Sequence, residues 1–260
     1  FRSLADGTKA NYRRHCEEIR TKNGTKDVRA FKRQDAIRVQ NALSDTWSKA
    51  NERIAVMSIL CALAVDLGWI EINPARDIRK LKGGSYEAWP DEKLVAFERY
   101  CKRHELTIER TIYELCIGTG QRIERVCQMQ WDDFDGRFMT VEAHKRGEPL
   151  TLYCPDRLQE HLATLPRNGR YILAKNLTQH LSKRRAQKLI ENVRSAINAE
   201  SFKPHGWRYN AVKELAEAGC SDASIQAVTG HKTTAMVQKY RAQADRKRLS
   251  ESAQKSRNKP

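Results

Sequence analysis

A tyrosine and two histidines in the C-terminal part of the chain have the residue types needed to attack a phosphodiester. Tyr240 lies nine residues after His231, and His205 lies three residues before Arg208. A phenol has a pKa of about 10, so it is a poor nucleophile at neutral pH unless a base takes its proton or cations stabilise its anion. The two histidines and the arginine offer both functions. The spacing therefore predicts a nucleophilic tyrosine in a phosphoryl-transfer site.

The remaining groups of such a site are expected upstream. A phosphoryl group in transfer spreads negative charge over its non-bridging oxygens, and arginine forks can bind that charge. The second arginine is Arg122, which follows a glycine-broken turn between two apolar helical stretches. A proton donor is also needed for the leaving 5′ oxygen. Lys145 is the candidate, because it lies between two alternating apolar and polar runs that predict a hairpin, and Lys175 and Lys203 are other basic candidates.

In order and spacing, these residues resemble the tyrosine recombinase family, in its phage integrase branch. Residues 119–123, followed by 131–135, resemble the family's box around its first arginine, and residues 205–240 resemble its second box. The resemblance covers nearly the whole chain. It implies six catalytic residues, Arg122, Lys145, His205, Arg208, His231 and Tyr240.

The resemblance also implies a role for each residue. Tyr240 attacks the scissile phosphate, which forms a 3′-phosphotyrosine and frees a 5′ hydroxyl. Arg122 and Arg208 hold the non-bridging oxygens, and His231 hydrogen-bonds the phosphate. His205 accepts the proton of Tyr240, while the lysine protonates the leaving oxygen. One phosphodiester replaces another, so we expect no cofactor and no metal ion.

Two positions depart from the family pattern. The family usually has an acidic residue three positions after the first arginine, where this chain has Arg125, with Glu124 one place earlier. The family also often has an aspartate after the first histidine of the second box, where this chain has Gly206. Both positions support the site, and neither is one of the six catalytic types. We therefore expect an active enzyme with altered support around Arg122.

The expected function is site-specific recombination or integration of duplex DNA, in the integration or excision of a prophage or mobile element. The expected partners are double-stranded DNA and three further copies of the chain, as a homotetramer on paired sites, with accessory DNA-bending or excision factors. Two alternatives stay open. A type IB topoisomerase would relax supercoils as a monomer, and a catalytically weakened DNA-binding regulator would bind without forming covalent adducts.

The composition agrees with a nucleic-acid partner. The chain has 48 Lys and Arg against 32 Asp and Glu, a formal net charge of +16, which a polyanion would neutralise. No apolar run approaches the ~20 residues of a membrane span, and no secretory leader precedes the first predicted helix. The seven cysteines form no CxxC pair, and their number is odd. We expect reduced core cysteines, no metal site, and a cytoplasmic, DNA-associated protein of bacterial or phage origin.

The expected fold class is mainly α with a small β-sheet (α+β). Residues 1–80 are predicted to form a small helical core-DNA-binding domain of the SAM-like type, residues 81–89 a basic linker, and residues 90–260 the catalytic domain with its tail. The chain begins at Phe1, inside the first helical domain, so we expect a fragment of a longer protein with an arm-binding domain ahead of it. The resemblance implies that the two domains close around DNA as a clamp.

Helical spacing and capping signals predict the individual elements. The predicted helices cover 8–20, 33–43, 48–67, 91–104, 107–117, 122–129, 155–165, 178–199 and 207–219, and the hairpin strands cover 137–143 and 149–153. The tail at 241–253 has good helix formers but only one large apolar residue, Leu249, so it needs a surface to dock on. The resemblance implies that this surface belongs to an adjacent protomer.

Overall fold

The structure, a computed structural model, consists of two compact units, residues 1–85 and 86–260. The division falls inside the stretch expected as a linker. The described residues are 3–84, 86–142, 149–231 and 233–257. Within the last helix the side chains of some residues are also outside the description, namely 236, 239, 240, 242–249 and 252.

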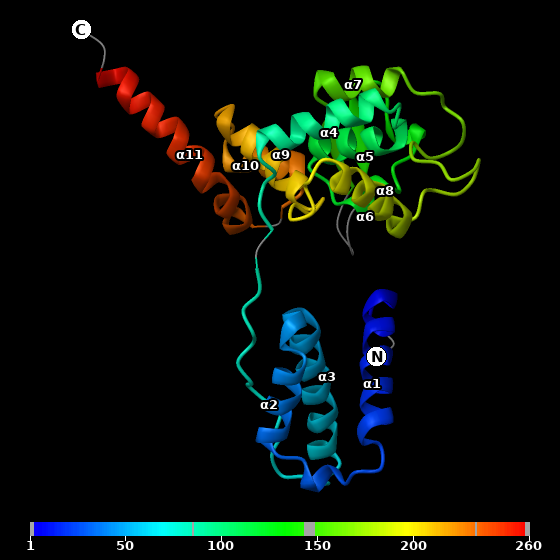
Figure 1. The fold of residues 1–260 in the computed structure, drawn as a ribbon, viewed down its shortest axis with the longest axis vertical. Coiled ribbons are helices and arrows are strands. Elements are labelled where there is room, and N and C mark those ends of the chain that lie inside the picture. Colours follow the sequence, from blue (N-terminus) through cyan, green and yellow to red (C-terminus); the bar gives the residue numbers. More distant parts are fainter. Residues whose placement is uncertain (1–2, 85, 143–148, 232, 258–260) are drawn as a thin grey trace. The chain divides into compact units, whose positions relative to one another are not determined.

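The first unit contains three helices (Figure 1), which pack around a small apolar core. The helices are α1 (Asp6–Asn23), α2 (Arg33–Ala42) and α3 (Trp47–Asp66), with short 3₁₀ turns at Val28–Ala30 and Ser44–Thr46. The buried members of the core are Ala36, Ile54, Met57, Cys61 and Ala75. The three predicted helices of this region are therefore present, with ends within three residues of the expected ones.

A partly buried polar cluster connects α1 to α3. Arg53, on α3, donates from Nε to Nδ1 of His15 at 3.0 Å, and it also pairs with Glu18. On its other side, His15 Nε2 lies 3.4 Å from the carboxylate of Glu52. Burial lowers the pKa of His15, and the neighbouring guanidinium of Arg53 lowers it further. The neutral imidazole therefore accepts from Arg53 and donates to Glu52.

The second unit is mostly helical and contains one two-stranded sheet, which confirms the predicted fold class. Its helices are α4 (Asp91–Arg103), α5 (Thr107–Thr119), α6 (Ile123–Val126), α7 (Asp156–Ala163), α8 (Lys183–Ala196), α9 (Gly206–Glu217), α10 (Asp222–Thr229) and α11 (Thr234–Arg257), with a 3₁₀ turn at Trp131–Asp133. The strands are β1 (Phe138–Val141) and β2 (Leu150–Tyr153).

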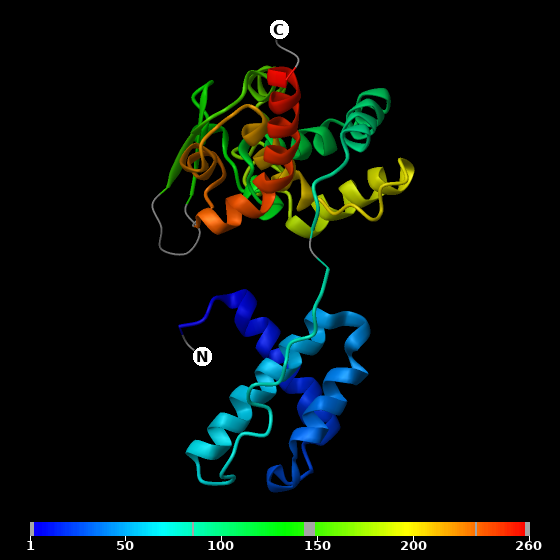
Figure 2. The same ribbon diagram turned by 90° about the vertical axis from the view of Figure 1, so that its left-hand side faces the viewer.

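The predicted hairpin is confirmed in its strands. β1 and β2 pair antiparallel, with Phe138 opposite Tyr153 and Val141 opposite Leu150, and they lie at one side of the helices (Figure 2). The inward residues Met139, Val141 and Leu152 are buried, as the alternating pattern requires. Residues 143–148, which include the expected proton donor Lys145, lie outside the described part of the chain.

An aromatic cluster fixes the start of α9 in the core of the second unit. The rings of Trp89, Phe97, Tyr113 and Trp207 pack together, with Trp207 centroids 5.1 Å from Trp89 and 5.2 Å from Phe97. The amide of Asn210 bonds both backbone groups of Trp89, accepting from its N–H at 2.8 Å and donating to its carbonyl at 2.9 Å. The chain just before α4 is therefore held against α9, the helix that begins after His205.

All seven cysteines are free, and five of them are buried. Burial raises the pKa of the thiols of Cys101, Cys127 and Cys154 to about 12, which suits inert core residues. Within the described residues, no helix is both long and apolar enough to cross a membrane.

Candidate phosphoryl-transfer site

Arg122 is positioned by a tight turn at the end of α5. Gly120 ends that helix with φ +61°, a left-handed conformation, and a Cβ at this position would lie 2.8 Å from Cγ2 of Thr229. The next residue, Gln121, donates from its side-chain amide to the carbonyls of Val228 at 3.4 Å and Thr229 at 3.2 Å. This turn therefore packs against the end of α10 and places Arg122 at the start of α6.

Arg208 joins the three segments that form the site. Its side chain is 4% exposed, on the first turn of α9. Nη1 donates to the carbonyl of Gly120 at 2.5 Å, and Nε donates to Nε2 of His231 at 3.1 Å. The guanidinium is thus held between the end of α5 and His231, which lies two residues after the end of α10.

The contacts of His231 determine which of its ring nitrogens carries the proton. Because Arg208 donates to Nε2, the proton of the neutral ring is on Nδ1, which lies 2.6 Å from Oγ1 of Thr229. That hydroxyl in turn donates to the carbonyl of Ile225 at 2.7 Å. In this geometry His231 orients Arg208. The expected bond from His231 to phosphate requires the other tautomer, with the threonine hydroxyl donating to Nδ1.

Both histidines are neutral at neutral pH. Burial, followed by the charges of Arg208 and Arg122, lowers the pKa of His231 to about 4. Burial also lowers the pKa of His205, again helped by the charges of Arg122 and Arg208. The half-buried ring of His205 lies at the N-terminus of α9 and contacts the edge of Tyr86, with centroids 4.9 Å apart. A neutral imidazole in this place can accept a proton.

Arg122, His205 and Arg208 line one groove with a volume of about 1010 Å³. Lys203 lines the same groove, whereas Lys175 does not line it and lies near the side chain of Gln179. One wall of the groove is a polar, mostly basic stripe of α8, made of Lys183, Arg184, Gln187, Lys188, Glu191 and Arg194. Among the described residues, no cluster of His, Cys, Asp or Glu has the arrangement of a metal site.

The structure brings together four of the six expected catalytic residues: Arg122, His205, Arg208 and His231. Tyr240 lies on α11, and its side chain is outside the described part of the structure, as is all of Lys145. The helix that carries Tyr240 packs on α9 and α10 through Val237, which is 0% exposed.

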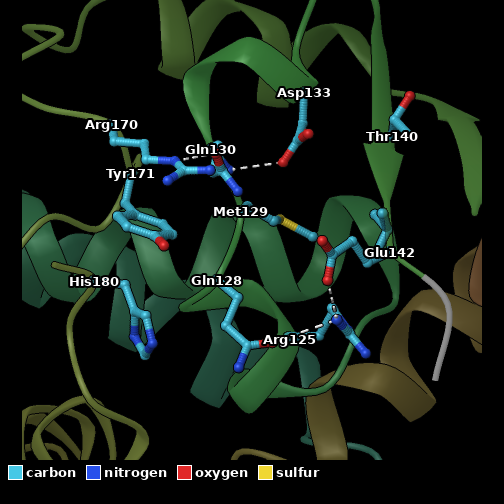
Figure 3. Close-up of a pocket in the computed structure, with 11 residues that line it drawn as sticks. Arg125, Gln128, Met129, Gln130, Asp133, Thr140, Glu142, Arg170, Tyr171 and His180 are labelled. Atoms are coloured by element: carbon cyan, nitrogen blue, oxygen red, sulfur yellow. Dashed lines mark hydrogen bonds and ion pairs between the residues drawn. The ribbon is translucent and has the colours of Figure 1, made fainter. Parts of the chain in front are cut away.

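Arg125, the first departure from the family pattern, lies at a small polar pocket beside β1 (Figure 3). Its guanidinium lies 3.6 Å from the carboxylate of Glu142, just after β1, and Nη1 donates to Gln128 at 3.4 Å. Arg170 closes the far side by donating to the side-chain amide of Gln130 at 2.6 Å (Figure 3). The residue at this position therefore links α6 to the strand that follows it.

Gly206, the second departure, has a steric reason. A Cβ at this position would lie 2.4 Å from the carbonyl oxygen of Glu87 and 2.7 Å from Cδ1 of Trp89. An aspartate therefore cannot fit while the segment before α4 packs so closely on α9.

Two supporting residues, Thr229 and Gln121, were missed by sequence reasoning. Thr229 lies two residues before His231, so its closeness to a candidate catalytic histidine was a usable signal. Gln121 bonds carbonyls more than a hundred residues away, and no local pattern indicates such a contact.

The sequence profile of the phage integrase family matches residues 92–247, which is more than half of the chain. Two curated relatives are the tyrosine recombinase XerC of Mycobacterium leprae and that of Mycobacterium tuberculosis (strain ATCC 25177 / H37Ra), 26% and 27% identical over 144 residues. Each match covers 51% of this chain and 48% of the relative, so the chain spans about half the length of these relatives.

Solved structures show the same fold. A lambda integrase dimer bound to a COC′ core site superposes with a TM-score of 0.78 at 22% identity, over 92% of this chain and 90% of that one. The Tn1549 transposon integrase in complex with circular intermediate DNA superposes with a TM-score of 0.74 at 14% identity, over 94% of each chain. The extent of the profile match, on a fold that gathers the expected arginines and histidines, shows that the chain belongs to the phage integrase family.

Proposed function

We propose that this protein is a site-specific DNA recombinase that cuts and rejoins duplex DNA through a covalent 3′-phosphotyrosine at Tyr240. One observation carries the proposal: Arg122, His205, Arg208 and His231 come from three separate segments, and the charges of the two arginines act on both histidines. The helix that carries Tyr240 begins three residues after His231 and packs against α9 and α10.

The two arginines bind the phosphate. Arg122 and Arg208 take the non-bridging oxygens, where negative charge builds up in the transition state, and preorganised donors stabilise that charge without moving during the reaction. Arg208 is held by Gly120 and by His231, so its guanidinium is already oriented. His231 either keeps this orienting role or, in its other tautomer, donates to the phosphate.

Protons move in two places. The phenol of Tyr240 gives its proton to neutral His205 as the bond from its oxygen to phosphorus forms. The bond from phosphorus to the 5′ oxygen breaks, and Lys145 donates a proton to that oxygen. In the reverse step, the 5′ hydroxyl of a second strand attacks the phosphotyrosine and releases the tyrosine. Because one phosphodiester replaces another, the scheme requires neither ATP nor a cofactor.

The relatives and the net charge support a proposed assembly. One solved lambda integrase is a tetramer bound to a Holliday junction, which supports a homotetramer on paired duplexes here. The net charge of +16 suits double-stranded DNA. In this proposal residues 1–80 form the domain that binds the core DNA site, residues 81–89 form the linker, and residues 90–260 form the catalytic domain with its tail. We further propose that accessory DNA-bending or excision factors assist the reaction. The proposed location is the cytoplasm of a bacterium or of a phage-infected cell, and the proposed substrate is the DNA of a prophage or mobile element.

The proposal is tested with duplexes selected for binding from a random-sequence pool and then nicked beside each candidate cleavage position. Cleavage next to a nick releases a short fragment, which traps the protein on DNA. The expected product is a covalent protein–DNA adduct with a free 5′ hydroxyl, together with strand exchange between two sites. Relaxation of supercoils without site pairing would instead identify a topoisomerase, and binding without adducts would identify a regulator.

A further inference from the structure

An ion pair between the start of α10 and α11 closes a loop that contains both His231 and Tyr240. Nη1 of Arg241 lies 2.5 Å from Oδ1 of Asp222, the first residue of α10. Gln238 donates to the other oxygen of the same carboxylate at 3.5 Å. Arg241 directly follows Tyr240 in sequence, so the bond acts on the helical turn that carries the tyrosine.

A buried side chain supports the ion pair from the same helix. Val237 is 0% exposed and packs with Val212, Ala216 and Ile225, which belong to α9 and α10. Residues four apart on a helix share a face, so Val237 and Arg241 form two successive anchors. Tyr240 lies in the turn between these anchors. Figure 1 shows α11 starting beside α10 and then running away from it.

The other end of α10 is attached to the phosphate-binding groups. There Thr229 bonds His231, which accepts from Arg208. A helix of eight residues is a rigid rod of roughly 12 Å. One end of this rod is thus connected to Arg208, and the other is bonded through Asp222 to the turn that carries Tyr240.

We infer that Asp222 is a positioning residue for Tyr240, acting through Arg241. The inference rests on the proposed function, because it assumes that Tyr240 is the nucleophile. The side chains of Asp222 and Arg241 are 26% and 18% exposed, so water and salt screen this pair less than a surface pair. Tyrosine attack requires alignment with the leaving oxygen, and small displacements of a reacting group cost large factors in rate.

The test is single-turnover cleavage of a nicked duplex by the whole chain. Asp222→Asn should lower the rate constant at saturating DNA about tenfold, which corresponds to ~1.4 kcal/mol in activation free energy. The Kd for DNA should stay within twofold of wild type. Asp222→Glu, which restores the charge, should recover the rate to within threefold. Arg241→Gln combined with Asp222→Asn should be no slower than the slower single variant.

Asp91 provides a matched control. It is also the first residue of a helix, α4, and its carboxylate accepts from Lys213 of α9 at 2.8 Å. Asp91→Asn removes a carboxylate from the same helix position, more exposed than that of Asp222 (73% against 26%) and not bonded to a residue of α11, so its cleavage rate should equal that of wild type.

Three results would overturn the inference while adducts from the wild-type protein keep the proposed function intact. They are a wild-type rate for Asp222→Asn, a rate loss fully explained by weaker DNA binding, and an equal loss in Asp91→Asn. Failure of the wild-type protein to form any adduct would remove the proposed function, and the inference with it.

Discussion

The side chains at the site hold one another through contacts that depend on charge. Arg208 donates to His231, and burial lowers the pKa of the two histidines, with the charges of both arginines lowering it further. These histidines are neutral and the guanidiniums are charged at neutral pH, so the site has bases and anion-binding groups side by side. This combination suits a reaction that removes a phenolic proton while it stabilises a phosphoryl group.

Removal of either arginine should slow the chemical step. Arg122→Ala should lower the single-turnover cleavage rate about 10²- to 10³-fold, the loss typical of a preorganised charge-stabilising donor. Arg208→Ala should cost at least as much, because it also removes the partner of His231. Arg184→Ala is the control, because it removes an arginine of α8 that lines the same groove but is not one of the two arginines proposed to bind the phosphate. A loss below threefold at saturating DNA for Arg122→Ala or Arg208→Ala would exclude the proposed role for that arginine.

The pKa of His231 predicts acid destabilisation. The folded imidazole has a pKa of about 4, while an unfolded one titrates near 6.5. Between these values the unfolded chain holds more protons, so the contribution of this group to stability is complete above pH 6.5 and is lost as the pH falls toward 4. The slope from this group is at most ~1.4 kcal/mol per pH unit.

The measurement is urea unfolding between pH 4 and pH 7 for the wild-type chain and for His231→Gln. The variant keeps the other histidines whose pKa is lowered, His15, His161 and His205. It loses only the contribution of residue 231 to the pH dependence of stability. Its free energy of unfolding should therefore fall less steeply with acid. Equal slopes would show that the folded pKa of His231 is not depressed.

At this scale the sequence predicts residue types but few partners. Arg208 and His231 are predicted as phosphate-binding groups, and the structure shows them buried and bonded to each other. That contact depends on the start of α9 meeting the segment that follows α10. Thr229 and Gln121 could not be assigned to the site from their types, because their bonds are made with groups fixed only by tertiary packing.

At the scale of elements, periodic patterns predict existence better than boundaries. The helix expected at 122–129 is a single turn, α6, because the chain leaves it to form a bridge between Gln130 and Tyr171. The helix expected at 178–199 begins at Lys183, since the hydroxyl of Ser182 accepts from the N–H of Arg185 and caps it. α10 was not predicted. The side chain of Ser221 caps the helix by accepting from the N–H of Ser224, and a serine before the helix is the signal in the sequence that indicates its start.

α9 packs closely against the segment that precedes α4, so any side chain larger than glycine at residue 206 should destabilise the fold. Gly206→Ala would place Cβ 2.4 Å from the carbonyl oxygen of Glu87, and the backbone must shift. Alanine gains up to ~1 kcal/mol in helix propensity, but overpacking costs ~1–3 kcal/mol, so the free energy of unfolding should fall. Gly84→Ala, where nothing lies within 4 Å, should change stability by less than ~0.5 kcal/mol. Equal thermal midpoints for the two variants would contradict this packing argument.

At the scale of the whole molecule, the chain combines a high positive charge with two compact units and a long terminal helix. α11 runs from Thr234 to Arg257, so the helical tail expected from the sequence is continuous with the turn that carries Tyr240. The described core contacts of this helix are near its start, at Val237. A surface outside the unit would stabilise the remainder.

Truncation after Ala244 tests the role proposed for this tail. The first turns of α11 keep their contacts through Val237 and Arg241, so DNA binding by single proteins should stay nearly unchanged. Strand exchange between paired sites should fall strongly, because the tail is expected to dock on an adjacent protomer. The comparison uses gel-shift titration for binding and labelled duplex pairs for exchange. Complete exchange by the truncated protein would show that the tail is dispensable.

The most direct test of the central claim is covalent adduct formation by Tyr240→Phe on nicked duplexes. The substitution removes only the phenolic oxygen, so DNA affinity should match that of wild type while the adduct, measured by denaturing gel electrophoresis, disappears. In the wild-type adduct, peptide mapping should place the nucleotide on Tyr240. An adduct formed by the phenylalanine variant, or a nucleotide mapped to another residue, would contradict the assignment of Tyr240 as the nucleophile.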